Sequence, residues 1–339
     1  MNAPALSALR PHLRSRHDLL VDGATARAID DRVATGGLQR IRRNAYVDGS
    51  VWRALSTEAR HTLHIAAVSR EAASDLVFSH VSAAVLHGLP LYRVQPRRVH
   101  VLVGAADRSS RRDVFRHEGE VPDDDVIEVD GVRCTSLERT VLDMARVAAP
   151  EVSLSCADAA LGIVGGHPRR FDDAAAEVWR EGMRRRCEMP GARGIRRARV
   201  IVDIADGRAE LPLESVTRLQ LRRLGFSRLR LQSPVPAPGG GCYWMDLELE
   251  EVDAFIECDG RGEYTEPAMR RGRTPEQVVL DEKRREDWVR GVTGRRVLRV
   301  SSSAIASTES LRRLLLAFHI PLPRRTHLEL PTPPLESGI

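Results

Sequence analysis

Two stretches decide the fold of the C-terminal half: Tyr243-Trp244-Met245-Asp246-Leu247-Glu248-Leu249 and, after a short turn, Ala254-Phe255-Ile256-Glu257-Cys258-Asp259-Gly260. Apolar and acidic residues alternate in both with a period of two. This period is typical of paired strands that turn one face to a core and leave the other face open. The open face is acidic.

A turn at Glu250-Glu251 predicts that Asp246 faces Phe255 and lies diagonal to Glu257, with Asp259 two residues further along the same face. Diagonal neighbours on paired strands are about 7–8 Å apart, a gap that one divalent cation bound by both carboxylates can bridge. Like charges buried together without a cation are costly. The alternative interpretation is an edge hairpin whose acids keep it soluble.

The surrounding pattern predicts a helix, three strands, a helix and a strand. The first helix covers 213–224 and carries Glu214, and a strand covers 228–232 before the acidic hairpin. Thr274-Pro275-Glu276-Gln277 combines an N-cap, a proline at N1 and a capping-box glutamine, so it predicts the start of a helix that ends near Gly291. A last strand follows at 296–300.

This order, with its acids, resembles the PD-(D/E)XK nuclease fold and, more narrowly, the very-short-patch-repair-like endonuclease domains. The resemblance implies a Mg²⁺ or Mn²⁺ ion held by Asp246 and Glu257, with Glu214 as an outer ligand. Many members of that fold have a lysine two residues after the second acid, where this chain has Asp259. Lys283 on the following helix is the candidate to take the place of that lysine in the site. The candidate catalytic residues are therefore Glu214, Asp246, Glu257, Asp259 and Lys283.

Residues 24–33 have helical periodicity, and residues 38–47 predict a small ribbon that carries Arg40, Arg42 and Arg43. A short helix followed by a basic ribbon is the arrangement with which a winged helix contacts DNA, because the ribbon binds phosphates.

Three further segments of the first half form a recognisable set: His80-Val81-Ser82-Ala83-Ala84, His87-Gly88-Leu89-Pro90 and Thr135-Ser136-Leu137-Glu138-Arg139-Thr140-Val141-Leu142-Asp143. Together with the ribbon they resemble the AbiEi-type antitoxins of abortive-infection systems. The resemblance implies a winged helix that binds DNA, a following α/β domain and a cognate toxin as partner. The spacing from Thr135 to Glu138 predicts a capping box. His80, His87 and His100 are interpreted as structural rather than metal-binding, because a fourth ligand at a suitable spacing is missing.

Basic residues beside the acidic site offer a second nucleic-acid contact. Arg284 and Arg285 lie on the helix that follows the hairpin and either bind the nucleic-acid backbone or pair with acids of the same helix. An acidic cleft alone would repel its substrate, so phosphate contact is favoured.

Composition limits the remaining choices. The chain has 339 residues, a net charge of +5 and five cysteines without a CxxC pair, which supports neither a zinc ribbon nor a disulfide framework. A run of eighteen apolar residues is absent, so we expect a soluble cytoplasmic protein without a membrane partner. The expected class is α/β, with five parts: a winged helix (1–50), an AbiEi-like α/β domain (51–150), a helical connector (151–210), an endonuclease-like αβββαβ domain (211–320) and a disordered tail (321–339).

These observations predict a DNA-binding protein with a Mg²⁺-dependent endonuclease domain, in phage defence or DNA repair. The alternative is a regulator or antitoxin of a type IV toxin-antitoxin system, in which the nuclease fold is only a scaffold.

Overall fold

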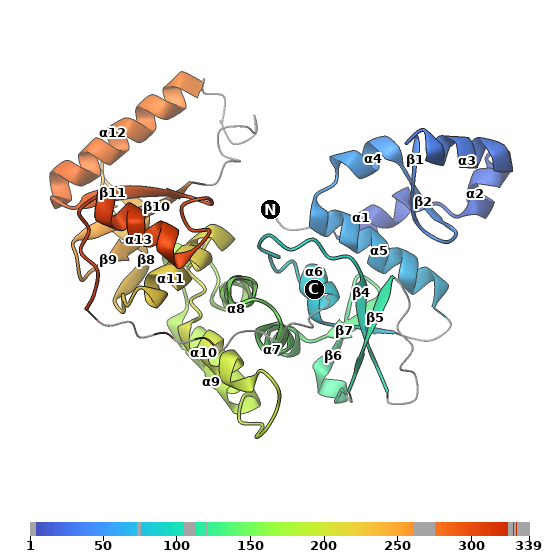
Figure 1. The fold of residues 1–339 in the computed structure, drawn as a ribbon, viewed down its shortest axis with the longest axis horizontal. Coiled ribbons are helices and arrows are strands. Elements are labelled where there is room, and N and C mark those ends of the chain that lie inside the picture. The colour runs from blue at the N-terminus through green and yellow to red at the C-terminus, as the bar shows by residue number, and fades with distance from the viewer. Residues whose placement is uncertain are drawn as a thin grey trace. The chain divides into compact units, whose positions relative to one another are not determined.

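The computed structural model describes residues 5–72, 76–104, 113–119, 121–259, 275–324, 328 and 330. It confirms a mixed α/β fold with parallel and antiparallel strand pairs (Figure 1). The chain forms two compact units. The first contains residues 5–156 and 182–201, and the second contains residues 157–181 and 202–324. Most of the expected tail (321–339), like the Thr274 cap, lies outside the described residues.

The N-terminal elements are short helices and a ribbon. In order they are α1 (Leu6–Leu9), η1 (Arg10–His12), α2 (Arg16–Val21), α3 (Ala26–Ala34), β1 (Leu38–Arg42), β2 (Ala45–Asp48), α4 (Gly49–Ala54) and α5 (Thr57–Glu71). Ser15 and Thr25 cap α2 and α3 by accepting backbone N–H bonds. Arg14 pairs with Tyr46 through two backbone hydrogen bonds of 2.8 Å and adds a bridge to the ribbon. The helix and ribbon expected here are thus observed.

A five-stranded mixed sheet in the order β5-β4-β3-β7-β6 follows. Its strands are β3 (Val77–Phe78), β4 (Val99–Val103), β5 (Val114–Glu118), β6 (Val126–Val129) and β7 (Val132–Thr135), with α6 (His80–Leu86), η2 (Asp123–Asp125) and α7 (Leu137–Val147) between and after them. Ser136, not Thr135, caps α7 and accepts from the Arg139 N–H. The capping-box prediction was one residue early because Thr135 ends β7 and contacts the Thr140 hydroxyl at 2.7 Å.

The helices expected to connect the two halves belong to both units. The boundaries between the units fall inside α8 (Pro150–Gly165), α9 (Asp173–Arg186) and α10 (Ile195–Ile204), and η3 (Pro168–Arg170) lies between α8 and α9. Each helix buries apolar residues along its length, such as Leu154 and Leu161 in α8. Residues 151–210 therefore contribute to two cores.

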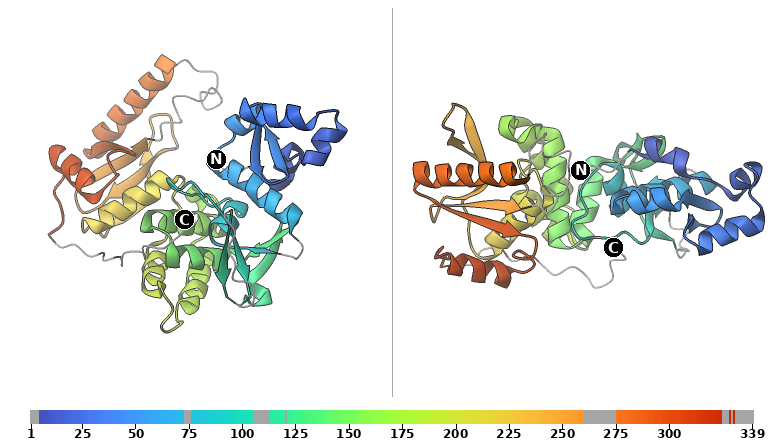
Figure 2. Two further views of the ribbon diagram at one scale, coloured as in Figure 1. Left: turned by 45° about the vertical axis from the view of Figure 1, so that its right-hand side comes forward. Right: turned by 90° about the horizontal axis from the view of Figure 1, so that it is seen from above.

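The second unit has the expected order of helix, three strands, helix and strand. It comprises α11 (Pro212–Arg223), β8 (Leu229–Pro236), β9 (Cys242–Leu249), β10 (Ala254–Asp259), α12 (Pro275–Thr293), β11 (Arg296–Ser301) and α13 (Thr308–Ala317). The sheet order is β11-β10-β9-β8, with β10 and β11 parallel. Val289 of α12 packs with Phe255 and Val297 on one face, and Cys258 contacts Thr217 of α11 on the other (Figures 1 and 2). The Thr308 hydroxyl of α13 donates to Gln220 of α11.

The pairing of β9 with β10 differs by two residues from the predicted register. Leu249 pairs with Ala254, and Glu248, not Asp246, is opposite Phe255. The turn therefore comprises residues 250–253, with Asp253 at a φ of 47°. Leu247 and Ile256 form the last pair of this ladder. Beyond it, the Asp246 side chain accepts from the Cys258 N–H, so it reaches across to the end of β10.

A buried ion pair fixes α11 against α8. Arg218 Nη2 lies 2.7 and 2.6 Å from the two carboxylate oxygens of Asp158, and the two side chains are only 2% and 1% exposed. Asp158 also accepts from the Asp206 N–H at 2.8 Å. Because Glu214 is one helical turn before Arg218, this pair sets the position of the first acid of the site.

Asp158→Ala should lower the free energy of unfolding by about 3–5 kcal/mol, because it leaves a buried guanidinium without its partner. The double variant Asp158→Leu/Arg218→Met should regain most of that loss. Urea unfolding followed by tryptophan fluorescence measures both. Asp173→Ala is the control, since its pair with Arg208 involves a side chain that is 76% exposed. An equal loss in Asp158→Ala and the control would contradict the argument.

Candidate metal centre

Three of the expected acids converge from three elements of the second unit. Glu214 comes from the first turn of α11, Asp246 from the middle of β9 and Glu257 from β10. Glu214 is 1% exposed, and the Glu257 side chain is 14% exposed. The structure thus places in one buried region three residues that are 43 positions apart in the chain at most.

Backbone groups hold each of these carboxylates in place. Asp246 Oδ2 accepts from the Cys258 N–H at 2.7 Å, and Glu214 Oε2 accepts from the Glu210 N–H at 3.0 Å. The Glu257 carboxylate accepts from the Asp246 backbone. The Asp246 and Glu257 side chains thus each accept a hydrogen bond from the backbone of the other strand. These two bonds fix the spacing of Asp246 and Glu257.

The pKa values of the three carboxyl groups reflect burial and mutual repulsion. Burial, and then the charge of Asp246, raises the pKa of Glu257 to about 8 and raises the pKa of Glu214 well above its ordinary value. Burial also raises the pKa of Asp246, although its bond from Cys258 opposes this shift. Ionising three carboxyl groups in one buried place costs free energy unless positive charge is supplied nearby.

Arg285 supplies part of that charge. Its Nη2 lies 3.3 Å from Glu257 Oε1 and donates to the Trp244 carbonyl at 2.6 Å, so this arginine turns toward the sheet. A small cavity beside it is lined by Glu257, Arg285 and Arg299 among others. Arg285 was expected to contact nucleic acid, whereas the structure places it as the partner of a site carboxylate. Its spacing on α12 gave no signal for this role.

The remaining predicted residues lie apart from the three acids. Asp259 pairs with Arg299 at 3.2 Å and is half-buried, and the charge of Asp259 is one cause of the raised pKa of Asp246. Lys283 is exposed on α12. Arg284 is also exposed and lies 3.9 Å from Asp281, so it is available to a partner in solution.

The donor set fits a hard cation that keeps most of its water. Among the described residues there is no group of three His, Cys, Asp or Glu side chains arranged to hold a metal ion. Mg²⁺ and Mn²⁺ need only one or two protein carboxylates, because waters and substrate phosphate complete the octahedron. Asp246 and Glu257 are therefore sufficient, with Glu214 acting through water.

The ribbon of the first unit divides its three arginines. Arg40 and Arg43 are exposed, whereas the Arg42 side chain is 10% exposed and lies 3.4 Å from Glu71 and 3.2 Å from Asp113. A bulge in the pairing between Arg40 and Arg42 breaks the strand alternation. The expected phosphate contact at Arg42 is not supported by this position.

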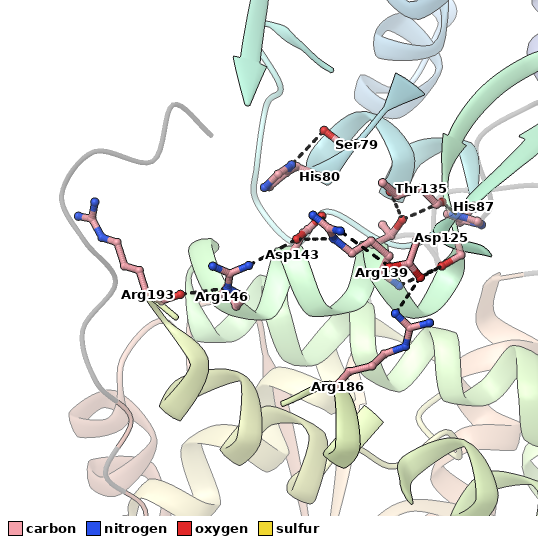
Figure 3. Close-up of polar contacts among 12 residues, drawn as sticks. Ser79, His80, His87, Asp125, Thr135, Arg139, Asp143, Arg146, Arg186 and Arg193 are labelled. Carbon is pink, nitrogen blue, oxygen red and sulfur yellow. Dashed lines mark hydrogen bonds and ion pairs between the residues drawn. The ribbon is translucent and has the colours of Figure 1, made fainter. Parts of the chain in front are cut away.

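Charged residues of α7 and of the segments around it form a structural network in the first unit (Figure 3). Arg139 Nε donates to both oxygens of Asp143 at 3.1 and 3.0 Å, and its guanidinium lies 3.8 Å from Asp125. Arg186 contacts Asp125 at 2.7 Å, and Arg146 donates to the Arg193 carbonyl at 3.0 Å. These bonds join α7 to residues 182–201.

Burial lowers the pKa of several histidines of the same unit, among them His61, His80, His87 and His117. His87 contacts the Thr135 carbonyl at 2.8 Å (Figure 3). The His80 and His117 rings stack with centroids 3.5 Å apart. Burial lowers the pKa of His61 to about 3 and that of His117 to about 4. The Ser82 hydroxyl accepts from the His100 backbone N–H at 2.8 Å and is hydrogen-bonded to His61 Nε2 at 2.9 Å. These contacts agree with the structural interpretation.

No family model matches the chain. Two proteins of Mycobacterium tuberculosis, from strains CDC 1551 / Oshkosh and ATCC 25618 / H37Rv, are similar to it and are described only as uncharacterised. Each is 27% identical over 281 residues, which cover 77% of this chain and 93% of the relative. That alignment is longer than either unit, so the similarity extends into both.

None of the described helices is both long and apolar enough to cross a bilayer.

The first unit should lose stability on acidification. Below pH 6.5 the unfolded chain binds a proton at His61 that the folded chain does not bind until about pH 3, so stability falls as the pH falls through this window. At pH 5 this one residue should cost about 2 kcal/mol. Unfolding between pH 4.5 and 7 measures the slope, which His61→Gln should reduce and His17→Gln, at an exposed position, should not. Equal slopes in both variants would refute the assignment.

Proposed function

We propose that this chain is a DNA-binding protein whose second unit hydrolyses phosphodiester bonds with Mg²⁺ or Mn²⁺. The observation that carries the proposal is the convergence of Glu214, Asp246 and Glu257, where burial and then the charge of Asp246 raise the pKa values of the two glutamates. A protein that needed only a scaffold would gain stability by replacing such acids with apolar residues. Their presence together supports a role that requires negative charge.

The proposed chemistry follows from the residues present. Asp246 and Glu257 would hold the cation, which supplies polarisation of the phosphate and a water of lowered pKa. Glu214 sits on the α11 side of Asp246 and would accept a proton from an attacking water. Arg285 reaches Glu257 and the Trp244 carbonyl, so it can move from the carboxylate to a phosphate oxygen and offset developing charge there.

The proposed DNA contact in the first unit rests on the exposed arginines of the ribbon. Arg40 lies on β1 and Arg43 in the turn between β1 and β2, and α3 precedes this ribbon. A winged helix has this arrangement, in which a helix enters a groove beside a ribbon that binds phosphates. Such contacts place the chain on a duplex without reading its sequence. Arg284 would add a further phosphate contact beside the acids.

Two observations favour a second candidate, a non-catalytic regulator or antitoxin that acts with a toxin partner. Arg285 already pairs with Glu257, and Asp259 stands where many members of the nuclease fold carry a lysine. In this alternative the guanidinium takes the place of the cation permanently, and the nuclease-like unit serves as a scaffold for DNA binding.

Incubation of the full chain with supercoiled plasmid and with single-stranded DNA in Mg²⁺ or Mn²⁺ should produce cleavage. Asp246→Asn and Glu257→Gln keep the size of each side chain but remove a charge, so each should reduce the rate more than about a hundredfold. The control Glu309→Gln, on exposed α13, should cleave normally. Stabilisation of the protein by Mn²⁺, measured by thermal unfolding, should be lost in the same two variants. Intact DNA binding without cleavage in the parent protein would favour the regulator.

Arg40→Ala and Arg43→Ala should each lower the salt dependence of duplex binding by about one unit of slope, because each removes one phosphate contact. Binding titrations over a series of salt concentrations measure this. Arg42→Ala is the matched control from the same ribbon. It should leave the slope unchanged and instead destabilise the first unit, since Glu71 and Asp113 lose their partner. A slope that changes only in Arg42→Ala would exclude the proposed contact.

A further inference from the structure

A second cavity in the second unit lies beside the acids and has a different character. Its volume is about 610 Å³, within the range of clefts that hold small ligands. Segments from η3 through the start of α9, the loop before α11, and strands β8 and β9 form its walls. The lining includes four arginines and two large aromatic side chains: Arg169, Arg170, Arg208, Arg230, Phe171 and Trp244.

The arginines and aromatic rings are arranged in stacked pairs. The Arg169 guanidinium carbon lies 5.6 Å from the centroid of the Trp244 ring, and that of Arg208 lies 4.5 Å from the centroid of Phe171. Planar guanidinium groups and aromatic faces are the two surfaces on which proteins stack unpaired bases. The cavity therefore presents stacking surfaces from two directions.

Two glycines hold the Phe171 ring in place. A methyl group on either Gly165 or Gly207 would overlap the ring, so the chain permits this position only where the side chain is absent. Arg208, which is fixed by Asp173 and Asp206, stacks over the same ring. Phe171 is thus packed in the wall of the cavity and holds the Arg208 guanidinium in position.

The charges in the lining favour an anion. Asp206 and Asp173 both pair with Arg208, and Arg169 lies 3.8 Å from Glu210. Arg170 and Arg230 are exposed, and no ion pair among the described residues involves either of them. These two guanidinium groups can therefore contact a phosphate.

The cavity is joined to the acid cluster through two strands. Gln232 of β8 lines the cavity, and its side chain hydrogen-bonds to Glu214. Gln232 has a φ of 50° and is missing from the regular pairing with β9, so a local irregularity turns it toward the acid. Trp244 is two residues before Asp246 on the same strand. A ligand in the cavity would lie along the strands that carry the site.

We propose that this cavity binds an unpaired nucleotide of the substrate strand, with its base stacked on the Trp244 ring and its phosphate on Arg170 and Arg230. The inference rests on the proposed function and adds a preference for single-stranded or locally unpaired nucleic acid. A duplex keeps its bases stacked on one another and could not stack a base on Trp244.

Binding of a fluorescent oligo-dT probe in EDTA tests this without cleavage. The full chain carries Arg40→Ala and Arg43→Ala in every sample, so the ribbon contributes little. Trp244→Leu should weaken binding roughly five- to a hundredfold, the value of one lost base stack, whereas Trp244→Phe should retain most of the affinity. Arg170→Ala/Arg230→Ala should lower the salt slope by about 1.4, at roughly 0.7 for each phosphate contact to a single strand.

The matched control for charge is Arg312→Ala/Arg313→Ala on α13, which should leave binding unchanged. An abasic probe should bind the parent protein as weakly as oligo-dT binds Trp244→Leu. Equal affinity for abasic and ordinary probes, or full competition by a poly-glutamate peptide, would overturn the nucleotide assignment. Failure of DNA cleavage with binding that still depends on Trp244 would reject the nuclease and retain the cavity assignment.

Discussion

The second unit depends on the burial of charge around Arg218. This arginine is almost completely enclosed, bonds both oxygens of Asp158 and donates to the Ile204 carbonyl. It therefore joins α8, the end of α10 and α11 at one point. Its charge also acts on Glu214, one turn earlier on the same helix. The buried guanidinium of Arg218 offsets the charge of Asp158 and part of the charge of Glu214. The sheet can therefore bring Asp246 and Glu257 close to Glu214.

On the side of β9 and β10, the negative charge of the site is not balanced by an equal positive charge. Asp246 and Glu257 lie on adjacent strands, and Arg285, which pairs with Glu257, also bonds a backbone carbonyl. Functional sites commonly concentrate like charge in this way, at a cost in the free energy of folding. The same strands continue into a cavity lined by arginine and aromatic side chains. An acidic centre beside a basic, stacking surface is an arrangement suited to a phosphodiester with an exposed base.

The local sequence pattern predicted the helices and strands of the second unit. It failed to predict features that depend on contacts between distant segments. The alternation in 243–249 and 254–259 located β9 and β10, but the turn has four residues, so the pairing slipped by two. The inward positions of Arg42 and Arg285 depend on a bulge and on a partner from another element, neither of which leaves a periodic signal. The cavity beside Trp244 could not be predicted, because its walls come from segments separated by more than sixty residues.

The most direct test of the central claim is anomalous diffraction from crystals of the full chain soaked in Mn²⁺. The account predicts a peak between Asp246 and Glu257, with carboxylate oxygens about 2.1 Å from the ion and Arg285 moved away from Glu257. A structure without this peak, in which Arg285 still pairs with Glu257 at saturating Mn²⁺, would contradict a metal-dependent site.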